Sequence, residues 1–306
     1  MLISASRRTD VPAFYTPWLL ERLAAGYCLT PNPYNPRQVA RLDLRPPALE
    51  ALILWSKNPA PLLPHLPELL ARGVRPSLLY TVNDYPAALE PAVPPLAQRL
   101  ATFRAWARLS GPERVVWRYD PILISRHTDP AWHVATFGRL CGELAGSTRR
   151  VKLSLVCFYR KTLRRLAPLE AAGWGFEQNP LARDEVWEML AGMVRLAREA
   201  GMELTACAPE HDLSPAGLRP GACISPAWLA AAWGLSFPPR RDPGQRSQCR
   251  CLPSRDLGSP DTCLHHCVYC YATRSEAAAR ANQARHDPRS PRLVGLAGED
   301  DSPTLF

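Results

Sequence analysis

The alternation of short apolar runs with longer stretches of helical periodicity constrains the fold of this chain more than any other feature. The apolar runs have the length of buried strands, and the stretches between them can hold crossover helices. This order is typical of a parallel sheet, so we predict an α/β fold, as a full or partial TIM-like (β/α) barrel. The predicted strands are 2–6, 51–56, 77–82, 114–119, 151–158 and 203–207.

Helical periodicity fills the intervals, and the rhythm stops near Pro209, where Pro- and Arg-rich sequence begins. We therefore divide the chain into a barrel-like domain over 1–212, a cysteine-rich cluster-binding segment over 213–285 packed on the barrel mouth, and a flexible tail over 286–306. The predicted helices are 17–25, 62–71, 95–109, 130–144, 183–200 and 276–285.

Composition and charge favour a globular protein over a membrane-spanning or secreted one. The chain has 306 residues, 46% of them hydrophobic, and no apolar run approaches the ~20 residues of a membrane span, so we expect a globular protein without a membrane partner. Charge appears as early as Arg7, too soon for a signal peptide, and we therefore expect a cytoplasmic protein. In that reducing compartment its ten cysteines point to metal binding or catalysis rather than to disulfides.

Polar residues follow the predicted strands, at the edge where parallel α/β folds bind their ligands. The basic side chains there suit a carboxylate or phosphate, and a carboxylate would accept a hydrogen bond from a substrate hydroxyl. The alternative is structural, because loops are polar in general and an Arg–carboxylate pair can tie adjacent loops together. The candidate catalytic residues are Arg7, Asp10, Lys57, Arg118 and Asp120, and the candidate cofactor-binding residues include Arg8 and Asn58.

Three cysteines lie within eight residues in the order Cys-x3-Cys-x2-Cys, at Cys263, Cys267 and Cys270. Thiolates bind iron–sulfur clusters, and three protein ligands would leave one iron of a four-iron cluster with an open position. Zinc is the alternative, since a structural zinc would need only one further ligand from a nearby histidine or thiol. We expect this segment to fold back over the barrel mouth, beside the candidate catalytic residues.

A second set of cysteines precedes this motif, and four thiolates would complete a second iron–sulfur cluster or a zinc site. Packing is the alternative for these residues, since a lone cysteine is commonly a small core residue. Cys28, Cys141 and Cys157 lie among apolar neighbours and are expected to be packing residues. The candidate ligands of the second centre are Cys207, Cys223, Cys249 and Cys251.

The motif, with an aromatic residue before its third cysteine, resembles the signature of radical S-adenosylmethionine enzymes, and its longer form is similar to the spore photoproduct lyase-like branch. That signature normally follows the first strand, whereas here it lies near the C-terminus. SASRRTDVP at 4–12, NPYNP at 32–36, WSKNP at 55–59, WRYDP at 117–121 and the terminal cysteines together resemble the DUF1848 family, which carries a radical-SAM-like cysteine cluster at its C-terminus.

The resemblance implies an enzyme in which Cys263, Cys267 and Cys270 hold a 4Fe-4S cluster whose fourth iron binds S-adenosylmethionine. Reductive cleavage of that cofactor would give methionine and a 5′-deoxyadenosyl radical that takes hydrogen from a substrate. Tyr269 would stack on or near adenine, or would pack as a structural aromatic. A reductant such as flavodoxin or ferredoxin would supply the electron.

Two other functional classes remain open at this stage. One is a non-catalytic iron–sulfur or zinc protein with a structural or electron-transfer cluster. The other is a nucleic-acid binder, suggested by a net charge of +9, from 37 basic and 28 acidic residues. Nearly all the basic residues are arginine, as a GC-rich genome would give, so nucleic acid is a weakly supported partner. The densest run, Arg160, Lys161, Arg164 and Arg165, has the spacing of a solvated helix face.

Overall fold

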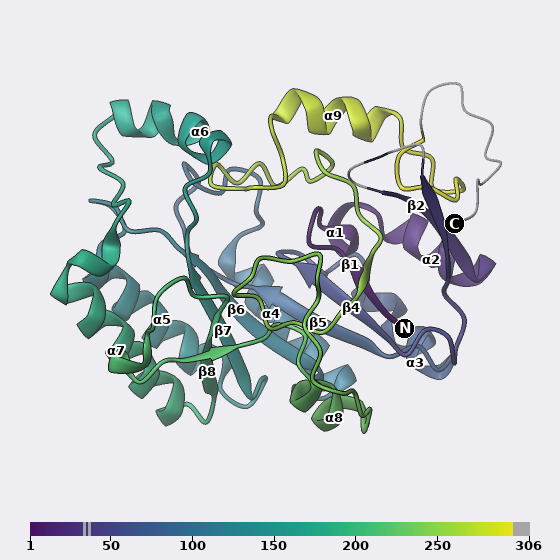
Figure 1. Cartoon of the computed structure of the whole chain (residues 1–306), viewed down its shortest axis with the longest axis horizontal. Coiled ribbons are helices and arrows are strands. Elements are labelled where there is room, and N and C mark those ends of the chain that lie inside the picture. The colour runs from purple at the N-terminus through teal and green to yellow at the C-terminus, as the bar shows by residue number, and fades with distance from the viewer. Residues whose placement is uncertain (33–34, 36–37, 296–306) are drawn as a thin grey trace. The chain divides into compact units, whose positions relative to one another are not determined.

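The computed structural model describes residues 1–32, 35 and 38–295, and Figure 1 shows its helices and strands. Contacts between residues divide the chain into two compact units. Unit 1 comprises Met1–Leu78, Ser254–His266 and the chain from Ala272 onward, and unit 2 comprises Leu79–Pro253 and Cys267–Tyr271. The cysteine motif is therefore shared, with Cys263 in unit 1 and the other two cysteines in unit 2.

Parallel strands dominate both units. Eight strands in the described residues form one sheet in the order β10-β1-β4-β5-β6-β7-β8-β9. In unit 1, β1 runs parallel to β4 and β10, and in unit 2, β7 runs parallel to β6 and β8, and β8 to β9. The predicted parallel α/β architecture is confirmed. The bounds are β1 Leu2–Ala5, β4 Ala51–Ser56, β5 Pro76–Thr81, β6 Val115–Ile122, β7 Arg150–Leu155, β8 Glu203–Cys207, β9 Arg219–Gly221 and β10 Arg255–Asp256.

Burial explains why these strands were visible in the sequence. Every residue of β1, β4 and β5 is buried, and a strand covered on both faces reads as a continuous apolar run. β7 ends at Leu155, before the predicted end at 158, and β6 continues through Asp120 and Pro121 to Ile122, beyond the predicted end at 119. A register shift between Tyr119 and Ile122 accommodates this irregular stretch beside β7.

The helices of unit 2 begin with local sequence signals. The side chain of Asp129 accepts a hydrogen bond from the backbone nitrogen of Trp132 at 2.7 Å, where α5 begins. Asp184 and Glu185 occupy the first turn of α7. Figure 1 shows α5 and α7 side by side along β7 and β8. The bounds are α4 Leu96–Ser110, α5 Pro130–Leu144, α6 Arg160–Ala171, α7 Asp184–Glu199 and α8 Pro226–Trp233.

Unit 1 contains an antiparallel hairpin that was not predicted, formed by β2 (Tyr27–Pro31) and β3 (Val39–Asp43). These strands alternate buried and exposed residues irregularly, so neither gives a clear apolar run. Pro33, Tyr34 and Pro36 of the NPYNP segment lie outside the described residues. The helices of unit 1 are α1 Val11–Phe14, α2 Thr16–Ala25, α3 Leu66–Ala71 and α9 Glu276–Ala284.

The chain that follows α9 is packed for at least ten residues. The indole nitrogen of Trp18 donates to the carbonyl of Ser290 at 2.9 Å, and the backbone nitrogen of Leu29 donates to the carbonyl of Pro291 at 2.9 Å. Leu293 is 2% exposed. Residues 286–295 of the predicted flexible tail are therefore held in unit 1, because this segment supplies buried apolar and backbone partners; 296–306 lie outside the described residues.

In the part of the chain that the structure describes, no helix combines the length and apolar character needed to cross a bilayer.

Candidate functional site

Asp10, which follows β1, is the centre of a hydrogen-bond network in unit 1. One carboxylate oxygen accepts from the backbone nitrogen of Ala13 at 3.0 Å and from Ser56 Oγ at 2.7 Å. The other accepts from the backbone nitrogen of Lys57 at 2.7 Å and from His265 Nε2 at 2.8 Å. Four donors satisfy a carboxylate that is only 5% exposed. Asp10 thus ties the ends of β1 and β4 to the cysteine motif.

The two arginines after β1 contact the segment that leads to the motif. Arg7 Nη1 donates to Ser254 Oγ at 2.9 Å, and its guanidinium lies 5.3 Å from the centre of the Trp55 ring. Arg8 Nη1 donates to the carbonyl of Gly258 at 3.3 Å. Both contacts hold loops together, as expected of structural arginines.

Lys57 and Asn58 occupy the loop after β4, and both are half-buried. The backbone nitrogen of Asn58 donates to Ser56 Oγ at 2.9 Å, and its side-chain oxygen accepts from Ala60 at 3.4 Å. The predicted residues of unit 1 therefore lie at the carboxyl ends of two adjacent parallel strands, and Asp10 connects them.

The first half of the cysteine motif is fixed in unit 1. Tyr15 Oη donates to the carbonyl of Thr262 at 2.7 Å, next to Cys263. Burial and the neighbouring Cys263 raise the pKa of Tyr15 to about 12. His265 is 2% exposed, and its ring meets the ring of Phe14 edge-on at 4.7 Å. The residues around Cys263 are thus anchored against α1 and α2.

The second half of the motif is anchored in an apolar cluster of unit 2. Cys267 and Tyr269 are each 7% exposed and pack in this cluster, which also contains Tyr85. Tyr269 Oη donates to the buried carboxylate of Glu90, and its ring centre lies 5.8 Å from that of Tyr85. Tyr269 is thus held by an apolar cluster, a ring contact and one hydrogen bond. Tyr271 is the exposed aromatic of this segment, at 53%.

Arg165, from α6, holds the turn that carries the last two cysteines. Its guanidinium donates to the carbonyls of Cys267 at 2.7 Å and of Cys270 at 3.4 Å. The turn is closed by the backbone nitrogen of Cys270, which donates to the carbonyl of Cys267 at 3.1 Å. Its neighbour Arg164 is exposed. One member of the arginine run is thus half-buried and binds the backbone that carries the last two cysteines.

The donor set of the motif suits an iron–sulfur cluster. Among the described residues, no three histidine, cysteine or acidic side chains already surround a point where a metal ion would fit. The motif nevertheless supplies three soft thiol ligands on one short, well-anchored segment, with a guanidinium to offset thiolate charge. These residues therefore fit the group that the motif implies.

The polar residues of unit 2 lie in two rows across the sheet. Arg118 of β6 stands opposite Lys152 of β7, which stands opposite Thr205 of β8. Two positions further along the strands, on the same face, come Asp120 and then Cys207. The sheet register thus gathers charged and thiol side chains at the carboxyl ends of these strands.

Arg118 and Asp120 form an ion pair in these rows, and Ser154 Oγ donates to the same carboxylate. Burial alone would lower the pKa of Arg118, but Asp120 and the thiols of Cys223 and Cys207 raise it above its ordinary value. Tyr271 acts on Arg118 in the same direction. In unit 2, Tyr271, at the end of the motif segment, is therefore near enough to the Arg118–Asp120 pair to influence the pKa of Arg118.

The four cysteines of the second set lie together in unit 2. Cys223 Sγ contacts Cys207 Sγ at 3.2 Å. The thiol of Cys251 forms side-chain hydrogen bonds with both Cys223 and Cys249. The contact with Cys223 lowers the pKa of Cys207, while the contacts with Cys207 and Cys251 raise that of Cys223. Side-chain contacts thus link cysteines that are up to 28 positions apart in the sequence, as Cys223 and Cys251 are.

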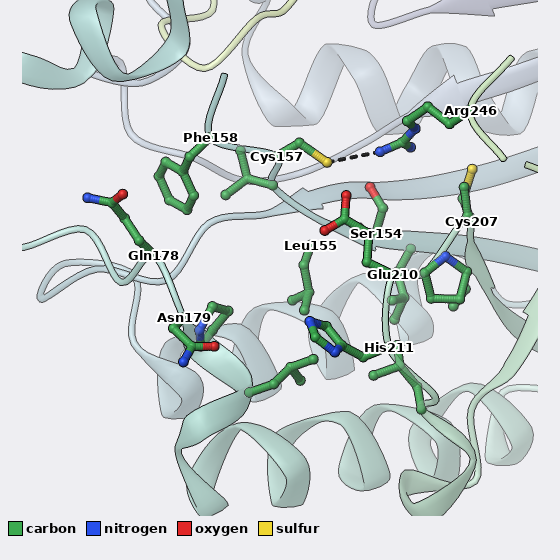
Figure 2. A pocket seen from close by; sticks show the side chains of 18 of the residues that line it. Ser154, Leu155, Cys157, Phe158, Gln178, Asn179, Cys207, Glu210, His211 and Arg246 are labelled. Atoms are coloured by element: carbon green, nitrogen blue, oxygen red, sulfur yellow. Dashed lines mark hydrogen bonds between the residues drawn. The ribbon is translucent and has the colours of Figure 1, made fainter. Parts of the chain in front are cut away.

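A cavity of about 360 Å³ opens beside these rows in unit 2, and Figure 2 shows the side chains that line it. Its wall includes Ser154 and Cys207 from β7 and β8, and Glu210 from the loop after β8. Arg246 Nη1 donates to Cys157 Sγ at 2.9 Å across one side. Cys157, expected to be a packing residue, is therefore a lining residue of a polar cavity.

Three residues of the motif environment were not predicted. Arg165 and Glu90 lie about 100 and 180 positions before the motif, and their contacts with it depend on the fold alone. His265 lies inside the motif but was considered only as a metal ligand. Its bond to Asp10 was not visible, because a sequence gives no sign of which strand end a distant loop reaches.

Comparison with known proteins gives one match. Residues 2–272 match the family described as "Domain of unknown function (DUF1848)". No curated protein and no solved structure matches the chain.

Proposed function

The chain belongs to the DUF1848 family, and from that premise we propose that it is a radical S-adenosylmethionine-type iron–sulfur enzyme. The observation that carries the proposal is the segment with Cys263, Cys267 and Cys270, which is fixed by contacts from strand ends and from α6. Cys263, Cys267 and Cys270 would hold the implied 4Fe-4S cluster, and when bound this group would supply one-electron reductive cleavage of S-adenosylmethionine to methionine and a 5′-deoxyadenosyl radical.

The residues of this chain would hold and shield that chemistry. The three thiolates supply the ligands, and the Arg165 guanidinium offsets part of their charge. Asp10 orients His265 between the first two cysteines. In unit 2, Tyr269 and its apolar neighbours exclude water from the base of Cys267, as a reactive intermediate requires.

The strand-end residues would bind the small molecules. Asp120, which is paired with Arg118, would accept hydrogen bonds from a ribose or a substrate hydroxyl. Arg7, Arg8 and Lys57 would favour an anionic or nucleic-acid-related substrate, and Asn58 would bind the cofactor. The exposed Tyr271 is a better candidate than Tyr269 for stacking on adenine, because the ring of Tyr269 is buried.

We also propose where the reaction takes place, both in the fold and in the cell. A sheet that curves into a full or partial TIM-like barrel would direct the carboxyl ends of its strands toward one mouth. A cytoplasmic location would keep the thiols reduced and supply a reductant such as flavodoxin or ferredoxin.

The experiment is anaerobic reconstitution with iron and sulfide, followed by reduction with dithionite in the presence of S-adenosylmethionine. Mass spectrometry should detect 5′-deoxyadenosine, and Cys263→Ala, Cys267→Ala and Cys270→Ala should each abolish it. Cys141→Ala is the matched control, because Cys141 is buried in α5 and belongs to neither cysteine group.

Four results would contradict this proposal. Unchanged iron and visible absorbance in all three variants would remove the ligand assignment. Iron that never turns over S-adenosylmethionine would favour an electron-transfer or structural cluster, and zinc without iron at the motif would favour a structural zinc. Steeply salt-dependent binding of oligonucleotides would point instead to nucleic acid.

A further inference from the structure

The second cysteine group consists of Cys207, Cys223, Cys249 and Cys251, and all four belong to unit 2. Cys207 ends β8, Cys223 follows β9 by two residues, and the other two lie on the loop that follows α8. That loop is held beside the extension of β9, because the backbone nitrogen of Leu252 donates to the carbonyl of Ile224 at 2.9 Å. Backbone pairing thus brings the three chain segments together.

Two of the four thiols are buried, and one of these two accepts a backbone hydrogen bond. Cys223 is 1% exposed and Cys251 is 2% exposed. The backbone nitrogen of Ile224 donates to Cys251 Sγ at 3.4 Å. N–H donors directed at sulfur are part of the outer shell that tunes metal-bound thiolates. A buried neutral thiol would gain less from such a donor.

The buried Lys152 is a second observation, independent of the contacts between the thiols, and it concerns charge. Lys152 is 6% exposed, and its ammonium donates to Thr205 Oγ1 at 2.6 Å. Within the described residues, no carboxylate lies within ion-pair distance of this ammonium. A buried unpaired cation is costly, so negative charge is expected nearby. After burial, which lowers the pKa of Lys152, the group that acts on this ammonium most strongly is Cys223, followed by Glu203 and then Cys207.

A close approach of backbone fixes this ammonium beside the cysteines. A Cβ on Gly221 would lie 2.4 Å from Thr205 Oγ1 and 3.2 Å from Lys152 Nζ. Only glycine fits at that point, which is two residues before Cys223 in the chain. The cation is therefore held against the strand that delivers one of the thiols.

We propose that Cys207, Cys223, Cys249 and Cys251 bind one thiophilic divalent cation, of which zinc is the type, as a closed four-thiolate site. Four thiolates around a divalent ion carry two negative charges, which Lys152 and Arg118 would offset. The site is separate from the 263–270 motif and does not rest on iron–sulfur chemistry.

The sulfur spacing favours a single ion over a cluster of several irons. Zinc–sulfur bonds of ~2.3 Å in a tetrahedron place the sulfurs roughly 3.8 Å apart. The observed 3.2 Å between Cys207 and Cys223 leaves room for no inorganic cube between them. The four sulfurs form a row and do not yet surround a common point. Rotation of the half-buried Cys249 and Cys207 side chains about χ1 would close the row around an ion.

The test begins with the wild-type chain, purified anaerobically from cells grown with zinc. We expect about one zinc per chain by mass spectrometry of the metals. After removal of zinc, titration with Co²⁺ should produce thiolate-to-cobalt charge-transfer absorption, which zinc should then abolish. Absence of zinc together with no such absorption would overturn the proposal, as would a Cys207–Cys223 disulfide in freshly purified protein.

Variants separate this site from the motif. Cys223→Ser and Cys251→Ser should lose the zinc and the cobalt absorption while the iron bound by the motif is unchanged. Cys141→Ser is the matched control and should keep both metals. Lys152→Gln keeps all four thiols, and we expect its zinc affinity to fall roughly 10-fold, as for other outer-shell changes. Loss of iron instead of zinc from Cys223→Ser would overturn the single-ion site in favour of a second cluster.

Discussion

The two cysteine groups of this chain are opposite in how they are built. Cys263, Cys267 and Cys270 are adjacent in sequence, yet they belong to two different compact units. Cys207, Cys223, Cys249 and Cys251 are dispersed in sequence, yet they are in contact within one unit. The sequence suggests both groups as ligand sets, but only the fold shows that the four cysteines of the second group are in contact. Local spacing alone is therefore an incomplete guide to metal sites, even in a cysteine-rich chain.

The largest expected effect is that a substitution in either cysteine group removes the metal of that group and leaves the other metal bound. Cys267→Ala should lose essentially all motif-bound iron and keep zinc, because two thiolates cannot hold the open-site cluster. Cys223→Ser should do the reverse. Iron and zinc are measured on the same reconstituted samples. If either variant loses both metals while its circular dichroism is unchanged, the two groups form one centre and the comparison fails.

Asp10→Ala tests whether the first cysteine group depends on the hydrogen-bond network of unit 1. Removing a buried carboxylate that accepts four hydrogen bonds leaves several buried donors without a partner, so we expect a loss of roughly 3 to 5 kcal/mol in the free energy of unfolding. Denaturation by urea measures the loss.

Asp43→Ala is the control for Asp10, because Asp43 bonds Arg45 at the exposed surface and should matter little. Asp10→Ala should also speed iron loss, because His265 loses its anchor, and should leave zinc in place. Equal stability of the two variants would show that the Asp10 network is not a structural tie.

Acid should weaken unit 2 through His133. Burial lowers the pKa of His133 from its ordinary 6.5 to about 4. Between those two pH values the unfolded chain binds a proton that the folded chain excludes. The stabilisation is therefore complete above pH 6.5 and is lost as the pH falls toward 4, by about 3 kcal/mol.

Urea unfolding at a series of pH values tests this assignment. His133→Gln should flatten the pH dependence, whereas His127→Gln, at an exposed position, should not. Because Tyr85 packs against both His133 and Tyr269, iron release should accelerate over the same pH range. An unchanged pH dependence in His133→Gln would remove His133 as the cause.

The smallest predicted effect compares two neighbouring arginines. Arg165→Gln removes charge-assisted hydrogen bonds to the carbonyls of Cys267 and Cys270, each worth about 1.5 to 3 kcal/mol. Since 1.4 kcal/mol is a factor of ten, we expect motif-bound iron to be lost to a chelator about tenfold faster. Arg164→Gln, on the exposed side of α6, should behave as the wild type. Equal rates for the two variants would exclude this role of Arg165.

Much of the fold followed from the sequence because parallel strands are buried on both faces. β4 and β8 begin and end where predicted, and so does α5, whose Asp129 cap and apolar face are both local signals. The β2–β3 hairpin was missed because its strands are only partly buried. Residues 286–291 were missed because their partners, such as Trp18, are distant in the chain.

The sequence predicted individual residues of the candidate site but not the contacts between them. Strand ends and cysteine spacing identified Asp10, Arg118 and the seven cysteines outside the packing set. No local pattern shows that Asp10 bonds His265 or that Lys152 is buried near the second group. Those relations depend on sheet register and loop paths, which act over more than a hundred residues. Register, once known, places Arg118, Lys152 and Thr205 in one row without further assumption.

The discontinuity of unit 1 has a consequence for biosynthesis. Its first 78 residues emerge from the ribosome long before Ser254–His266, which supplies β10 and the His265 partner of Asp10. Most of unit 2, with all four thiols of the second group, is complete by then. The thiols of the first group are made last. A chain interrupted before residue 263 would carry the second group and none of the first, so iron would enter only a chain whose translation had passed both units.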